Sequence, residues 1–147
     1  MNILVCDDDQ AIVDAIEIYL SQEGYTVLKA YDGLEAIRMV KEKEIQLVIL
    51  DIMMPRMDGI RATMKIREIS AVPIIFLSAK SEDVDKILGL NVGADDYITK
   101  PFNPLELNAR VKSVLRRYTQ LGAIAEKKDT VFQIGGLRVD DDRKEVT

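Results

Sequence analysis

The sequence predicts an α/β fold, in which a doubly wound, five-stranded parallel sheet carries helices on both faces. Short apolar segments alternate with segments whose apolar residues recur at helical spacing. The apolar segments are continuous runs, as is typical of strands buried on both faces. Four of them end in residues suited to phosphoryl chemistry, and parallel strands bring such ends to one edge of the sheet.

The strands can be placed because each apolar run is bounded by polar or turn residues. They are expected at residues 3–6, 26–28, 47–50, 74–77 and 97–99.

Helices are expected between these strands and after the last one. Asp32 and Glu35 form a capping-box pattern at the start of the second helix, and Ser81 is expected to cap the fourth. Asn103, with a proline at the first turn, marks the start of the last helix. We expect this helix to end at about Tyr118.

Composition excludes several classes of protein. The chain has 147 residues, a net charge of -5 and a sequence pI of about 4.8, which argues against a nucleic-acid surface over most of its length. It contains no histidine, so imidazole metal sites and Ser-His or Cys-His catalysis are excluded. With no long apolar run and no signal-type segment at the N-terminus, we expect a cytoplasmic protein that does not engage a membrane.

The pattern changes near the C-terminus. Residues 1–119 are expected to form the first domain, and residues 120–130, which lack apolar periodicity, a linker. Residues 131–147 contain short apolar segments separated by turn residues, a pattern that predicts antiparallel strands. They are too few to bury a core, so we expect them to open a second domain that continues beyond this chain.

Three carboxylates are predicted to gather at the polar edge of the sheet. Asp7 and Asp8 follow the first strand, and Asp51 follows the third. Like charges a few ångströms apart repel by several kcal/mol at an effective dielectric constant of about 20. Mg²⁺, a hard cation that takes oxygen ligands, is the natural partner. Alternatively Asp7, Asp8 and Asp9 cap the first helix, which is the interpretation we favour for Asp9.

The strand ends also supply a candidate nucleophile and two side chains that could bind a phosphoryl group. A carboxylate can accept a phosphoryl group, and Asp51 is the candidate. Ser78 can donate a hydrogen bond to a phosphoryl oxygen, and Lys100 can place positive charge on another. Taken alone, such a serine or lysine is ordinary polar surface, but together with the acids both are expected to be functional. A cis bond before Pro101 would help to aim the lysine.

The ordered motifs identify a family resemblance. They are Asp7-Asp8, Asp51-Ile52-Met53-Met54-Pro55 with Asp58-Gly59, Leu77-Ser78-Ala79, Gly93-Ala94-Asp95-Asp96-Tyr97 and Lys100-Pro101-Phe102. Over residues 1 to about 119 the chain resembles the receiver domain of two-component response regulators. The resemblance implies the flavodoxin-like strand order 2-1-3-4-5, which is known for receivers. It also implies a phosphoacceptor, not an enzyme, that assists its own phosphorylation and dephosphorylation and is served by a sensor histidine kinase.

The resemblance assigns a metal site and a phosphorylated residue. Asp51 is the residue expected to be phosphorylated. Asp8 and Asp51 are expected to ligate Mg²⁺ together with the backbone carbonyl of Met53. Asp7 is expected to help through a water molecule.

It also assigns the residues around the phosphoryl group. Lys100 and Ser78 are expected to contact it, and Ser78 with Tyr97 to form the switch pair. Met53 and Lys80 are expected to flank the path of the water that hydrolyses the aspartyl phosphate. Met53 is apolar with only a weak acceptor, so a long-lived phosphorylated state is predicted.

The C-terminal part resembles a particular class of response regulator. The string from Ala94 to Phe102, the helix start at Asn103 and the pair Arg116-Arg117 are similar to OmpR/PhoB-type transcription factors, with VanR-type regulators as a closer likeness. The tail over residues 132–146 resembles the opening strands of their winged-helix domain. The resemblance implies transcription control through promoter DNA, bound by an effector domain that is mostly absent here.

A dimer is expected to follow phosphorylation. The resemblance places its interface on the fourth helix, fifth strand and fifth helix, which carry Lys86, Asp95, Asp96, Glu106 and Arg110. Lys86 is expected to meet Glu106, and Asp96 to meet Arg110, across a two-fold axis. Pairing of these charges within one chain is the alternative.

Three other functions fit the sequence less well. A magnesium-dependent phosphatase of the haloacid-dehalogenase type needs an acid two residues after its nucleophile, where this chain has Met53. A flavodoxin-like electron carrier needs a hydroxyl-rich first loop, and this one is acidic. A stand-alone receiver that acts through protein contacts alone would not need residues 131–147.

Overall fold

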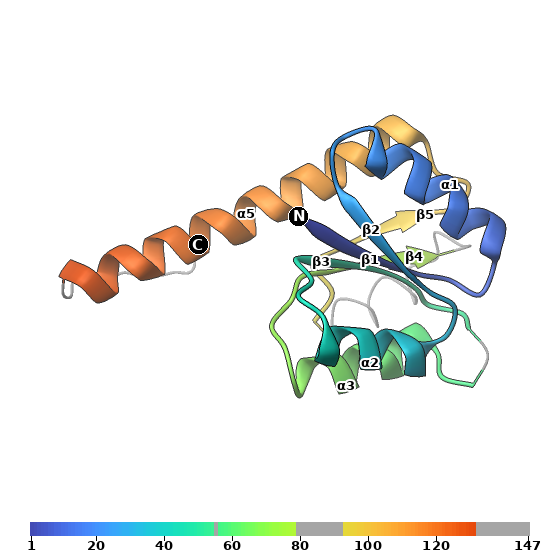
Figure 1. Cartoon of the computed structure of the whole chain (residues 1–147), viewed down its shortest axis with the longest axis horizontal. Coiled ribbons are helices and arrows are strands. Elements are labelled where there is room, and N and C mark those ends of the chain that lie inside the picture. Colours follow the sequence, from blue (N-terminus) through green and yellow to red (C-terminus); the bar gives the residue numbers. More distant parts are fainter. Residues whose placement is uncertain (55, 79–92, 132–147) are drawn as a thin grey trace. The chain divides into compact units, whose positions relative to one another are not determined.

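The computed structural model describes residues 1–54, 56–78 and 93–131, with side chains described up to residue 119. Its centre is a parallel five-stranded sheet in the order β2-β1-β3-β4-β5 (Figure 1). The predicted doubly wound sheet and its strand order are therefore confirmed. The strands are β1 (Asn2–Cys6), β2 (Thr26–Ala30), β3 (Leu47–Asp51), β4 (Ile74–Ser78) and β5 (Asp96–Thr99).

Helices connect the strands and follow the last one. The described helices are α1 (Gln10–Ser21), α2 (Gly33–Glu42), α3 (Gly59–Arg67) and α5 (Pro104–Val131). The helix expected after β4, with Ser81 as its cap, lies outside the described residues.

The predicted end of the last helix at Tyr118 was wrong, because α5 continues to Val131. Most of the added residues are good helix formers such as alanine, leucine, glutamate and lysine, and the one glycine among them costs too little to end the helix. The linker role of residues 120–130 stays a prediction, and residues 132–147, with the expected antiparallel strands, lie outside the described residues. The chain divides into two units, Met1–Leu115 and Arg116–Thr147.

Side-chain caps fix where the helices begin. Asp9 accepts a hydrogen bond from the backbone N–H of Ala11, so the capping role favoured for Asp9 is confirmed. At α2, Asp32 accepts from the backbone N–H of Glu35 at 2.8 Å. The Glu35 carboxylate accepts in turn from the N–H of Tyr31, one residue before the cap, instead of from the cap itself.

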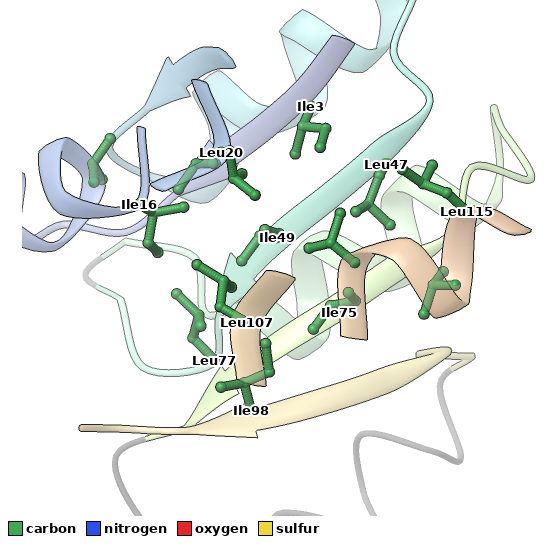
Figure 2. Close-up of a cluster of buried hydrophobic side chains, with 14 residues drawn as sticks. Ile3, Ile16, Leu20, Leu47, Ile49, Ile75, Leu77, Ile98, Leu107 and Leu115 are labelled. Carbon is green, nitrogen blue, oxygen red and sulfur yellow. The ribbon is translucent and has the colours of Figure 1, made fainter. Parts of the chain in front are cut away.

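The strands bury alternate residues on opposite faces of the sheet, since side chains along a strand alternate in direction. Ile3 and Val5 of β1 face α1 and the first turns of α5, whereas Leu4 and Cys6 face α2 and α3. Figure 2 shows the cluster on the first face, which includes Ile16 of α1, Ile49 of β3 and Leu107 of α5. Helices therefore pack on both faces of the sheet, and the candidate functional residues lie at the carboxyl ends of its strands.

The second face is built in the same way. Its buried residues include Val48 and Leu50 of β3, Phe76 of β4 and Ile66 of α3. Among the described residues, no helix has the length and apolar character needed to cross a membrane.

Candidate functional site

Three carboxylates meet at the carboxyl edge of the sheet. Asp7 and Asp8 directly follow β1, and Asp51 ends the neighbouring strand β3. Their closest carboxylate oxygens lie within 4.8 Å of one another. Asp7 is fully buried and Asp51 is 3% exposed, whereas Asp8 is exposed to solvent. The predicted gathering of these side chains at one edge is what the structure shows.

Lys100 places an ammonium group among these acids. Its Nζ lies 2.8 Å from Asp7 Oδ2 and 3.5 Å from Asp51 Oδ1. Its backbone N–H donates to the carbonyl of Ser78 at 2.7 Å, which fastens the end of β5 to the end of β4. The bond between Lys100 and Pro101 is cis, as expected from the sequence. Asp7 is thus the lysine's nearer partner and Asp51 the more distant one.

The charges alter the ionisation of the site. Burial and the nearby Asp7 carboxylate raise the pKa of Asp51 to about 7, against the opposing influence of Lys100. Partial burial works against the charge on Lys100, but hydrogen bonding to Asp7 and the carboxylate charges raise its pKa overall. Among the described residues, the ammonium group of Lys100 faces three carboxylates, so this part of the site retains an excess of negative charge.

The donor set suits a hard divalent cation. It consists of carboxylate oxygens from two adjacent strand ends, without nitrogen or sulfur ligands among the three residues. Two of the acids are withdrawn from water, so a cation there would offset repulsion that solvent screens poorly. The backbone of Met53 lies next to the cluster, with its N–H donating to Asp51 Oδ1 at 3.4 Å. These residues therefore fit a magnesium ion.

The residues expected around a phosphoryl group are only partly described. Ser78 ends β4, is 3% exposed and pairs in register with Thr99 of β5. Tyr97 is half-buried on β5 and packs against the cluster that faces α2 and α3. Lys80 and Lys86 lie outside the described residues. The structure thus brings Lys100 to the acids and attaches it to the strand end that carries Ser78.

Gly59 allows helix α3 to begin directly against the residue at the centre of the site. A Cβ atom at this position would lie 2.2 Å from the backbone oxygen of Asp51. The Gly59 N–H donates to the carbonyl of Ile52 at 2.8 Å. The nearest neighbours are backbone atoms, which cannot move aside as a flexible side chain can. Glycine is therefore required at this position.

Three of the charged residues expected at a dimer interface, Asp96, Glu106 and Arg110, are paired within the chain. Nη1 of Arg110 lies 2.8 and 3.0 Å from the two carboxylate oxygens of Asp96, and Nε lies 3.3 Å from Glu106. This is the intrachain alternative that the sequence left open. It leaves the intermolecular pairing of Asp96 with Arg110 as a prediction.

Asp95 has a structural contact that the sequence did not reveal. Its carboxylate accepts from the backbone N–H of Ile74 at 2.8 Å and lies 3.4 Å from the guanidinium of Arg67. Arg67 also donates to the carbonyls of Val72 and Gly93. Apart from their contact with each other, Arg67 and Asp95 bind backbone atoms. Every residue has such atoms, so no pattern in the sequence indicates these contacts.

Known proteins are similar to this chain in sequence and in fold. The family described as Response regulator receiver domain matches residues 3–112. VanR of Enterococcus faecium is 49% identical over 92% of this chain, and the PhoP regulator of alkaline phosphatase synthesis in Bacillus subtilis is 42% identical over 94%. A receiver domain of a Francisella response regulator superimposes with a TM-score of 0.75 at 36% identity, covering 80% of this chain and 98% of that one.

The relatives are longer than this chain. It spans 59% of the length of VanR and 60% of that of PhoP, both of which are regulatory proteins by name. Family match, relatives and fold agree with the motifs at the strand ends. The chain therefore belongs to the response regulator receiver domains, and its relatives are response regulators of the OmpR/PhoB type.

Proposed function

We propose that this chain is the phosphoacceptor part of a transcriptional response regulator and that Asp51 receives the phosphoryl group. The observation that carries the proposal is the ammonium group of Lys100, held 2.8 Å from Asp7 and 3.5 Å from Asp51 within a cluster of three carboxylates. Phosphoryl transfer depends on positioning and on neutralising charge, and this cluster offers both.

The proposed transfer has a simple balance of bonds. A carboxylate oxygen of Asp51 forms a bond to the donor's phosphorus, and the bond from phosphorus to the leaving group breaks with its electron pair. Lys100 and the Ser78 hydroxyl would then hold the oxygens of the phosphoryl group. Asp8, Asp51 and the Met53 carbonyl would hold Mg²⁺, with Asp7 acting through water, and the ion would neutralise charge on the phosphoryl oxygens.

The partners belong to the proposal as well. A sensor histidine kinase would supply the phosphoryl group, since the chain belongs to the response regulator receiver domains. The chain has no histidine of its own, so a phosphohistidine donor would be another molecule. Phosphorylation would favour a homodimer through the surface that carries Lys86, Asp95, Asp96, Glu106 and Arg110, with Ser78 and Tyr97 as the switch pair. Promoter DNA would be bound by a C-terminal domain that residues 131–147 begin, in the cytoplasm.

A direct test is incubation with acetyl phosphate and Mg²⁺, followed by measurement of the intact mass. The wild-type chain should gain one phosphoryl group, and Asp51→Asn should gain none. Asp14→Asn is the matched control, since Asp14 is a half-exposed carboxylate on α1 that pairs with Lys29. Equal labelling of Asp51→Asn and the wild type would overturn the proposal.

The metal has its own test. Omitting Mg²⁺, or adding a chelator in excess, should abolish labelling of the wild type. Asp8→Asn should need a higher Mg²⁺ concentration for half-maximal labelling, because it removes an exposed carboxylate of the cluster. Labelling that is indifferent to the metal would contradict the assignment of these acids.

A further inference from the structure

Met53 is the most exposed methionine of the chain and lies two residues after Asp51, the proposed site of phosphorylation. Its side chain is 71% exposed, compared with 57% for Met1 and 54% for Met64. Asp51, two residues earlier, is 3% exposed. The Met53 N–H lies 3.4 Å from Asp51 Oδ1, so the backbone of this exposed residue adjoins the buried carboxylate.

We propose that Met53 is a site of reversible oxidation by peroxides, and that its sulfoxide shortens the life of a phosphoryl group on Asp51. The second half rests on the proposed phosphorylation of Asp51. The first half rests only on exposure and sulfur chemistry.

The oxidation balances with a peroxide as the only co-reactant. A lone pair of the thioether sulfur attacks one peroxide oxygen, the O–O bond breaks, and an S–O bond forms. The departing hydroxide takes the remaining proton and leaves as water. The sulfur is oxidised by two electrons, the peroxide is reduced by two, and methionine sulfoxide reductases reverse the change.

The other sulfurs near the site are protected. Cys6 is fully buried, and burial together with the Asp32 carboxylate raises the pKa of its thiol, so the reactive thiolate does not form. The sulfur of Met54 lies 3.5 Å from Cys6 Sγ, and Met54 and Met57 pack against the core between the sheet and helices α2 and α3. An oxidant that reaches this edge of the sheet therefore meets Met53 first.

Oxidation changes what Met53 can do to water. A thioether is a weak hydrogen-bond acceptor, whereas a sulfoxide oxygen is a strong one. Hydrolysis of an aspartyl phosphate requires a water placed in line with the bond that breaks. A polar acceptor at the border of the Asp51 site can hold such a water, which the apolar side chain cannot. The sulfoxide should therefore accelerate loss of the phosphoryl group.

The first experiment measures where oxidation occurs. The purified chain is treated with dilute hydrogen peroxide, and the oxidation of each methionine is followed over time by peptide mass spectrometry. Met53 should be oxidised faster than Met64, which lies on α3 and is 54% exposed, and several-fold faster than Met54 and Met57, which pack against the core. Oxidation of Met64 at the same rate as Met53, or faster, would overturn the selectivity.

The second experiment measures the consequence. Phosphorylated protein is prepared with and without prior peroxide treatment, and loss of label is timed. Peroxide should shorten the half-life several-fold in the wild type and in Met64→Leu, but not in Met53→Leu, which keeps an apolar side chain without sulfur. Methionine sulfoxide reductase should restore the original half-life.

The outcomes separate the two proposals. If untreated protein cannot be labelled on Asp51, the proposed function fails and this effect of oxidation fails with it. If labelling succeeds and Met53 is oxidised, but the half-life is unchanged or shortens equally in Met53→Leu, only the present inference fails.

Discussion

Arg110 contacts both carboxylate oxygens of Asp96 within one chain, at 2.8 and 3.0 Å, whereas the family resemblance implied a contact between two chains. The same guanidinium lies 3.3 Å from Glu106. Asp96, Glu106 and Arg110, three of the residues proposed to join two subunits, therefore already pair with one another within one chain. Dimer formation must exchange these pairs between chains, so they would determine register more than affinity.

Reversing the charge of Arg110 tests this exchange. Arg110→Glu should weaken the dimer of the phosphorylated protein, because it places a third acid beside Asp96 and Glu106. Adding Asp96→Arg should restore part of it. Each exposed pair contributes about 0.2–1 kcal/mol, so the shift in dimer dissociation constant should be about tenfold or less.

Sedimentation velocity of the phosphorylated protein provides the measurement. Lys112→Glu is the control, since Lys112 lies on the same helix but pairs with Glu23 instead of with the proposed interface. An unaltered dimer in Arg110→Glu, or equal weakening by Lys112→Glu, would show that the interface lies elsewhere.

Lys100 should matter for stability as well as for phosphoryl binding. Asp7 is fully buried, and Lys100→Met would leave its carboxylate in the cluster without the ammonium group. Removing one partner of a buried pair is costly, and we expect a loss of about 3 kcal/mol in the free energy of unfolding without metal. Because the remaining acids repel more strongly, Mg²⁺ should raise the melting temperature of this variant more than that of the wild type.

Urea unfolding with and without Mg²⁺ checks this expectation. Lys29→Met is the control, because Lys29 pairs with Asp14 and Glu17 at the surface, where such pairs contribute less than about 1 kcal/mol. Equal losses in the two variants would mean that Lys100 is not coupled to the acids in solution.

Asp51 predicts how stability depends on pH in the metal-free protein. Its pKa is raised to about 7 in the folded state, against about 3.9 in an unfolded chain. Between these values the unfolded state binds fewer protons, so the free energy of unfolding contributed by this group falls as pH rises. The full penalty applies above the folded pKa and disappears below the unfolded one.

Asp51→Asn should remove this penalty. In the presence of a chelator, the variant should melt at a higher temperature than the wild type at pH 8, and the difference should shrink as the pH approaches 4. Thermal unfolding monitored by circular dichroism gives the comparison, with Asp14→Asn as a control that should not be stabilised at pH 8, because it removes a partner of Lys29. A wild type that is as stable as Asp51→Asn at pH 8 would contradict the raised pKa.

The sequence predicted the parts of this molecule that depend on strands ending in polar residues. Asp7, Asp51, Ser78 and Lys100 each follow or end an apolar run, and parallel strands bring such ends together whatever the details of packing. The length of α5 was missed because the predicted stop relied on a lost apolar periodicity, which reports burial and not helix formation.

The contacts of Arg67 with backbone atoms could not be predicted from the sequence. Arg67 holds the carbonyls of Val72 and Gly93, residues that lie close only after the sheet has formed. The nearer pairing of Lys100 with Asp7 was missed for a related reason. Two adjacent acids are equivalent in sequence, and only burial distinguishes the enclosed Asp7 from the exposed Asp8.

The lifetime of the phosphorylated state should depend on Met53. Its backbone N–H lies 3.4 Å from Asp51 Oδ1, and its side chain is apolar and 71% exposed. We expect this side chain to obstruct an attacking water, which its weak sulfur acceptor cannot orient. We expect label on Asp51 to persist for hours without a phosphatase. Met53→Asn should shorten this time, since an amide can hold a water by hydrogen bonds, and each tenfold change in rate corresponds to about 1.4 kcal/mol of barrier.

The measurement is loss of label from purified phosphoprotein, with Met64→Asn as the matched control. Met64 is exposed on α3, so the same substitution there changes the surface without reaching the site. A wild-type half-life of seconds would show that Met53 does not protect the phosphoryl group. Equal half-lives in Met53→Asn and the wild type would show that residue 53 does not control access of water to the phosphoryl group. Met53 would then have only a packing role in its loop.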